Sequence, residues 1–312
     1  MSRVTQIAVL EEFSLCLIIA DKSLIAYHLD VIVPLSSMGV QHDSARRAPQ
    51  KLSGTRDVSF FATARMKDRT LVFYKKREGL HSTFKVLEPV FQKSTEKKSR
   101  LFAKKLGAGT TEFFREFDEF YIPTECFTIN LFHTYIAIST QKGFELMTLD
   151  KKVPMSIPDL KNPATESIGN KIANQRPLGM FRLSDAEFLL CYDECGVYID
   201  KHGDVSRSVI MMFVGKAKHA AMYGAYLVLF DTDFVEIRNA ENGRLRQIIA
   251  GRDIRCLDYG VNPLGAGNAT SYTTPTAESG GERRTLKLAM AHPEVNGNQV
   301  VLEMVLNEGH SE

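Results

Sequence analysis

The stretch KHAAMYGAYLVLFDTDFVEIRNAENGRLRQIIA, residues 218–250, contains four short runs that are rich in β-branched and other apolar residues. The runs are residues 218–222, 225–230, 234–239 and 244–250. Their periodicity is mostly two residues, which is the period of a β-strand. The last two runs are joined by Ala-Glu-Asn-Gly, and Asn-Gly is the strongest short signal for a β-hairpin. The stretch therefore predicts an antiparallel sheet of four strands.

Similar groups of runs recur along the rest of the chain, at residues 4–29, 58–87, 126–149, 178–200 and 254–306. Most groups contain one run that is almost wholly apolar, such as LCLIIA or YLVLF, as expected of a strand covered on both faces. Four-stranded antiparallel units that repeat every ~40–50 residues are typical of a β-propeller. We therefore expect an all-β fold, a β-propeller with about six readable blades, and a single domain over residues 1–312.

The composition excludes several classes of protein. The 39 Lys and Arg residues nearly balance the 37 Asp and Glu residues, and the net charge of +2 argues against a dedicated nucleic-acid binder. The apolar fraction of 44% is enough for a sizeable core. The densest apolar runs are far shorter than the ~20 residues that span a bilayer, and no secretory signal is visible. The sequence thus predicts a cytoplasmic protein without a transmembrane segment.

The five cysteines are odd in number and scattered, and most lie inside apolar runs: Cys16, Cys126, Cys191, Cys195 and Cys256. We expect reduced thiols that pack as small hydrophobic side chains. Cys191 and Cys195 are close in sequence, but a zinc site generally needs a second such pair or suitably spaced histidines. A metal or redox role for this pair is the less favoured alternative.

Signatures of catalysis are missing from the sequence. It contains no G-x-S-x-G elbow, no phosphate-binding G-x-x-x-x-G-K-[ST] loop, no G-x-G-x-x-G turn and no H-E-x-x-H helix. Acidic pairs such as Glu11 and Glu12 lie at predicted turns, where carboxylates usually accept backbone hydrogen bonds. We expect no enzyme, no metal and no cofactor. A hydrolase with its residues spread around a central channel is the weakest alternative.

Three segments interrupt the strand pattern, and we expect them to be flexible insertions: residues 36–56, 91–112 and 260–284. The first and third are polar and rich in Gly, Pro, Ser or Thr. The aromatic residues that follow the second, within residues 113–121, are spaced as in a short amphipathic helix. An aromatic strand that enters the third group is the alternative.

The second insertion opens with a basic run that contains a single acid, Glu96. Its cationic residues are the candidate partner-binding patch: Lys93, Lys97, Lys98, Arg100, Lys104 and Lys105. Such a patch suits an acidic protein surface or anionic lipid headgroups, whereas the plain alternative is a solvated loop. Nucleic acid is disfavoured because the acidic stretch at residues 112–119 would repel phosphates.

Several long blocks resemble the citron homology (CNH) family. They are QIAVLEEFSLCLIIADKSLIAYHLD (6–30), a block ending in STFKVLEP (58–89), YIPTECFTINLFHTYIAISTQKGFELMTLD (121–150), EFLLCYDECGVYIDKHGD (187–204) and FVEIRNAENGRLRQIIAGRDIRCL (234–257). The version that they resemble most is the fungal one attached to guanine nucleotide exchange factors for Rho-type GTPases. Together the blocks cover most of the chain outside the insertions.

This resemblance implies a seven-bladed propeller that acts as a non-catalytic protein-interaction and regulatory module. Its implied partner is a Rho-type small GTPase or another signalling protein in cell-wall integrity signalling. An intramolecular contact with the exchange domain is a further option. The exchange chemistry belongs to a separate helical domain in such proteins. The implied location is the cytoplasm, with recruitment to the cell cortex or plasma membrane left open. The alternative is a membrane-tethering or lipid-reading propeller.

Six readable groups against seven implied blades leave two interpretations open. Either an N-terminal blade is missing from this chain, or the propeller closes with six. Loss of a first blade would expose a sheet edge and an apolar flank. We therefore expect this chain to be less stable and more prone to aggregation than a chain extended at its N-terminus.

Overall fold

The structure, a computed structural model, describes residues 4–32, 48–52, 57–90, 113–257 and 286–305. These residues form six antiparallel sheets, five with four strands and one with three. The chain divides into two compact units with a boundary near Cys126. The expected all-β fold is confirmed: each sheet is a meander of the kind that forms a propeller blade.

The first unit holds two sheets and two short helical turns. The first sheet has the order β1 (Val4–Leu10), β2 (Leu15–Ala20), β3 (Ser23–His28) and β4 (Gln50–Lys51). The second has the order β5 (Val58–Met66), β6 (Arg69–Glu78), β7 (His81–Pro89) and β8 (Phe114–Ile122). The turns are η1 (Glu11–Phe13) and α1 (Leu29–Ile32).

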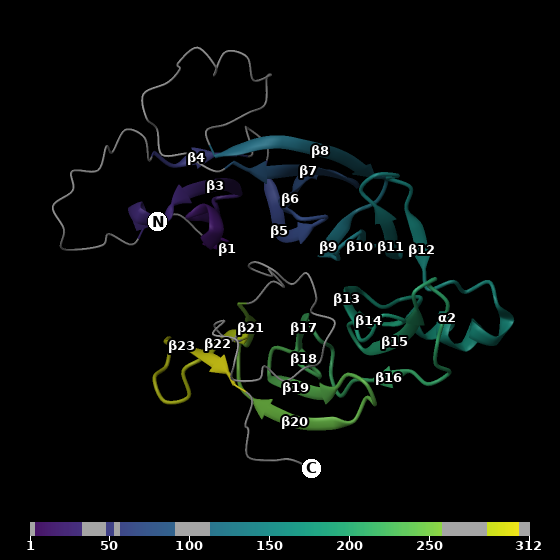
Figure 1. Cartoon of the computed structure of the whole chain (residues 1–312). Coiled ribbons are helices and arrows are strands. Elements are labelled where there is room, and N and C mark those ends of the chain that lie inside the picture. The colour runs from purple at the N-terminus through teal and green to yellow at the C-terminus, as the bar shows by residue number, and fades with distance from the viewer. Residues whose placement is uncertain (1–3, 33–47, 53–56, 91–112, 258–285, 306–312) are drawn as a thin grey trace, which may run out of the picture. The chain divides into compact units, whose positions relative to one another are not determined.

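The second unit holds the other four sheets, which follow one another along the chain (Figure 1). The third sheet contains β9 (Cys126–Leu131), β10 (Tyr135–Thr140), β11 (Gly143–Thr148) and β12 (Met155–Ile157). After η3 (Pro163–Thr165) and α2 (Glu166–Ile172), the fourth contains β13 (Pro177–Arg182), β14 (Glu187–Tyr192), β15 (Cys195–Asp200) and β16 (Met211–Met212). The fifth contains β17 (His219–Tyr223), β18 (Tyr226–Phe230), β19 (Phe234–Asn239) and β20 (Leu245–Ala250). The sixth contains β21 (Arg255–Cys256), β22 (Leu286–Ala291) and β23 (Gln299–Met304).

Strand β18 shows why one run in a group is apolar throughout. Leu227 and Leu229 pack with the fourth sheet, and Val228 and Phe230 pack with the sixth. Alternate side chains of a strand point to opposite faces of its sheet, so a strand with a neighbouring sheet on both sides needs apolar residues at every position. The prediction from YLVLF is therefore confirmed.

Two predictions between the groups were wrong. Residues 114–122 form a strand, as the alternative predicted, and not a short helix, but this strand, β8, pairs with β7 as the outer strand of the second sheet and does not belong to the third. Its register explains the choice, since Phe120 lies opposite Phe84 and stacks on that ring in the core of the same sheet. Within the first insertion, Gln50 and Lys51 pair with β3 instead of forming a loop. The rest of the predicted insertions lies largely outside the described residues.

Side chains of one sheet bind the backbone of the next. The buried amide of Gln6 on β1 accepts a hydrogen bond from the Phe61 N–H (3.0 Å) and donates one to the Phe61 carbonyl (2.6 Å). In the second unit, Asn130 on β9 accepts a hydrogen bond from the Met180 N–H of β13 (3.0 Å). In both cases a first strand is tied to the first strand of the next sheet. Backbone ladders cannot make this connection, because each sheet is complete in itself.

Replacement of Gln6 with alanine tests this connection. The Gln6→Ala variant leaves the Phe61 N–H and carbonyl without these partners in a buried position, so we expect it to lose about 1–3 kcal/mol of unfolding free energy. Urea denaturation measures this loss. Gln141→Ala, at an exposed turn, is the matched control and should unfold like the parent chain. Equal stability of Gln6→Ala and Gln141→Ala would contradict the structural role of the amide.

Candidate interaction site

The predicted basic patch lies outside the described residues. Lys93, Lys97, Lys98, Arg100, Lys104 and Lys105 all belong to residues 91–112, which connect β7 to β8. The two ends of this connection are held together, because the Val90 N–H donates to the Phe113 carbonyl (2.8 Å). Phe113 and Phe114 are buried, which fixes the position of the return strand. The surface beside these two ends is therefore the described part of the candidate site.

A charged pocket of about 310 Å³ lies beside Val90 in the first unit. Glu88 is the central acid of this pocket: one carboxylate oxygen accepts from Arg115 Nε (2.6 Å) and the other lies 3.2 Å from Arg69 Nη1. Arg65 also lines the pocket, and its guanidinium has no hydrogen bond or ion pair with any residue that the structure describes. The lining balances three arginines with three acids, and the acids are Glu12, Asp68 and Glu88. The pocket thus offers an available guanidinium in a neutral setting.

Tight turns place these side chains at the rim of the pocket. Lys67 and Asp68 join β5 to β6, and both have positive φ angles, of 46° and 63°. Two such residues match the twist of a short β-hairpin and keep the flanking strands paired up to the turn. Arg65 and Arg69 therefore leave the same end of the hairpin. Sequence reasoning missed this group because its members are separated by long stretches of chain.

The outer strand β8 carries a second charged group. Lys85 lies within 3.5 Å of both Glu116 and Glu119, and Lys76 also pairs with Glu119. Burial lowers the pKa of Lys85, but the two carboxylates outweigh burial and raise it. Burial likewise raises the pKa of Glu119, and the two lysines outweigh it and lower that pKa. The charged side chains of this group pair with one another within the sheet. The aromatic rings of Phe117 and Tyr121 on the same strand are exposed.

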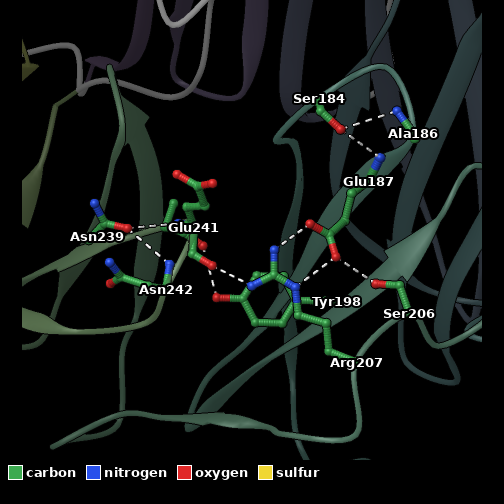
Figure 2. Close-up of polar contacts among 10 residues, drawn as sticks. Ser184, Ala186, Glu187, Tyr198, Ser206, Arg207, Asn239, Glu241 and Asn242 are labelled. Carbon is green, nitrogen blue, oxygen red and sulfur yellow. Dashed lines mark hydrogen bonds and ion pairs between the residues drawn. The ribbon is translucent and has the colours of Figure 1, made fainter.

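A third polar group, around Arg207, links the fourth and fifth sheets (Figure 2). Its guanidinium binds both carboxylate oxygens of Glu187, donates to the Glu241 carbonyl and lies 3.9 Å from the centre of the Tyr198 ring. Tyr198 in turn donates to the Ala240 carbonyl (2.8 Å). The hydrogen bond from Arg207 is the main cause that lowers the pKa of Glu187.

The Arg207 group is suited to hold sheets together rather than to perform acid–base chemistry. Glu187 is occupied by Arg207 and by the Ser206 hydroxyl, which donates to it at 2.8 Å. Burial raises the pKa of Tyr198 to about 12, so its phenol stays protonated and keeps its hydrogen bond. A general base needs a free acceptor and a pKa close to the working pH. Neither side chain meets that requirement.

The cysteines behave as the sequence predicts. All five are buried, and none forms a disulfide bond. Burial raises the pKa of Cys195 to about 12, and its thiol lies 3.3 Å from the Gln175 side-chain oxygen. Burial also raises the pKa of the Cys191 thiol well above its ordinary value. The described residues contain no group of three or more metal-binding side chains, and none of their helices is long and apolar enough to cross a bilayer.

The fold defines a β-propeller, and polar groups such as those around Arg207 hold its sheets together. Within this class, the chain belongs to the CNH domain family, whose model matches residues 1–260. The resemblance found in the sequence is thereby confirmed.

The relatives include exchange factors from fungi. The chain is 30% identical to Rho1 guanine nucleotide exchange factor 1 of Schizosaccharomyces pombe over 270 residues, which are 86% of this chain and 20% of that protein. It is 32% identical to Rho1 guanine nucleotide exchange factor 2 of the same organism over 286 residues, which are 90% of this chain and 23% of that protein. The chain thus spans about a fifth of these relatives. The solved AfRom2 CNH domain has a TM-score of 0.72 at 24% identity and matches 97% of this chain and 81% of that one, which shows a shared fold.

The buried thiols give a direct test of the cysteine assignment. In the folded chain, we expect all five cysteines to react with Ellman's reagent at a small fraction of the rate of free cysteine, because burial blocks access to each thiol. Burial also raises the pKa of Cys16, Cys191 and Cys195, which lowers their thiolate fraction. Unfolding in urea should release all five for rapid reaction. A thiol that reacts rapidly in the absence of urea, while the protein remains folded, would contradict the assignment.

Proposed function

We propose that this chain is the non-catalytic regulatory module of a Rho-type guanine nucleotide exchange factor, and that it binds a Rho-type small GTPase or another signalling protein. The observation that carries the proposal is the match to Rho1 exchange factors over more than four-fifths of the chain. The fold supports it, since a propeller of short strands is unlike the helical domain that performs nucleotide exchange. In this proposal the chain acts in cell-wall integrity signalling, in the cytoplasm or at the cell cortex.

The connection between β7 and β8 is the proposed contact region. Its six basic residues lie at residues 93–105, a few residues after Val90, and Val90 lines the pocket that contains Arg65. A partner with an acidic surface could pair with the basic residues while one of its carboxylates reaches Arg65. Exposed charge pairs of this kind mainly set the rate of association and its dependence on salt. An intramolecular contact with the exchange domain would use the same chemistry.

Charge reversal tests the contact region. A variant with Lys97, Lys98, Arg100, Lys104 and Lys105 changed to glutamate should bind a Rho-type GTPase at least about tenfold more weakly and with a flatter salt dependence. Binding is measured with GDP-bound, GTP-analogue-bound and nucleotide-free GTPase. The matched control reverses five exposed lysines of the second unit: Lys142, Lys151, Lys161, Lys171 and Lys201.

The outcomes separate the proposal from its alternative. Equal loss of binding in both variants would reject a specific role for the basic run. Absence of binding in every nucleotide state would reject direct GTPase recognition. The alternative, a membrane-tethering or lipid-reading propeller, predicts that the parent chain sediments with anionic liposomes and not with neutral ones. Sedimentation with anionic liposomes and no GTPase binding would replace the proposal with that alternative.

A further inference from the structure

Strand β20 of the fifth sheet is an edge strand without the usual protection. It pairs with β19 on one side, and none of its six residues is buried. Natural edge strands are commonly kept very short or lined with charge. The outer strands β4, β12 and β16 have only two or three residues, and β8 is lined with charged residues. β20 is longer than the short ones and has the sequence LRQIIA.

Apolar side chains gather on one face at this edge. Leu245 and Ile248 lie opposite Arg238 and Glu236 of β19, so both point to the same face of the sheet. They are 46% and 43% exposed. Val214 lies beside them, because its N–H donates to the Glu236 carboxylate (2.9 Å), and its own side chain is 62% exposed.

Among the residues that the structure describes, none pairs with the outward backbone groups of β20 at this edge. The Gly251 N–H donates to the Asp233 carbonyl (2.8 Å), which makes this a hydrogen-bonded pair of the ladder. Hydrogen-bonded and non-hydrogen-bonded pairs alternate along an antiparallel ladder. Ile248 and Ala250 therefore occupy non-hydrogen-bonded pairs and direct their N–H and carbonyl groups away from β19. These groups are positioned to bind an additional strand.

Positive charge stands at both ends of the apolar edge. Residues 244–253 include three arginines and one acid, Asp253. Arg244 comes directly before β20 and Arg252 follows two residues after it, and both are exposed. Neither guanidinium has a hydrogen bond or ion pair with the residues that the structure describes. The charges therefore favour an acidic occupant.

We propose that β20 is a docking edge for an extended segment of a partner protein that has an apolar centre and acidic ends. The segment adds as a fifth strand, its backbone pairs with Ile248 and Ala250, and its apolar side chains cover Leu245, Ile248 and Val214. Its acidic ends pair with Arg244 and Arg252. This surface belongs to the second unit and does not depend on the proposed contact region in the first.

The test uses the full chain and a fluorescein-labelled synthetic peptide, Asp-Asp-Val-Thr-Val-Thr-Val-Asp-Asp, in a fluorescence anisotropy titration. We expect saturable binding, and about tenfold weaker binding to Ala250→Pro, which removes the outward N–H and leaves the ladder to β19 intact. Ala250→Ser keeps that N–H and is the matched control, with affinity like the parent chain. The Arg244→Glu/Arg252→Glu double variant should instead prefer a peptide with lysine in place of aspartate.

Four results would overturn the proposal. One is absence of saturable binding of the aspartate peptide to the parent chain. Another is equal affinity of Ala250→Pro and Ala250→Ser, provided that both melt at the parent temperature. The third is dimerisation of the parent chain in light scattering that Ala250→Pro abolishes, which would assign the edge to a second copy of this chain. Because the double variant alters only exposed side chains, a charge preference that fails to invert also counts against the proposal.

Discussion

The structure depends on hydrogen bonds that run from a side chain of one sheet to the backbone of the next. In the described part of the chain, each sheet completes its own ladder, and no ladder runs from one sheet to the next. Only single backbone bonds outside the ladders, such as that from the Val58 N–H to the Lys22 carbonyl (2.7 Å), also join neighbouring sheets. Apolar packing between faces supplies most of the contact, and it has little directional preference. Gln6 and Asn130 fix the direction, because each binds a particular backbone group on the first strand of the next sheet. Arg207 and Tyr198 do the same near the outer strands.

Because the buried polar groups already connect neighbouring sheets, they are poor candidates for catalysis. The sheet edges are better candidates for binding. A side chain whose polar atoms are already bonded, such as Glu187 with Arg207 and Ser206 or Gln6 with the Phe61 backbone, has no capacity left for a substrate. Among the described residues, the charges that remain available at the surface include Arg65 beside the β7–β8 connection and Arg244 and Arg252 beside β20. A module built in this way presents fixed surfaces to partners, in keeping with the proposed regulatory role next to an exchange domain.

Much of the fold could be predicted from the sequence, because period-two runs and the Asn-Gly hairpin report local geometry directly. Strand β18 was predictable from YLVLF, since two buried faces require apolar residues at every position. Strand β8 was not predictable, because the spacing of its aromatic residues also fits a helix. Only the pairing and stacking of Phe120 with Phe84 on β7 distinguish the strand from a helix. The turn η3 had a local signal in Asn162 and Pro163, a cap followed by a proline at the first turn. The Glu88 pocket had no local signal in the sequence, since its charged residues come from strands that are far apart in the chain.

Hydrogen exchange of single amides tests the connection between sheets most directly. The amides of Phe61 and Met180 are bound by the side chains of Gln6 and Asn130. If these bonds hold the sheets together, both amides will exchange as slowly as the central ladder amides of β18, and each will lose that protection when its own side-chain partner is changed to alanine. Rapid exchange of both amides in the parent chain would contradict this account.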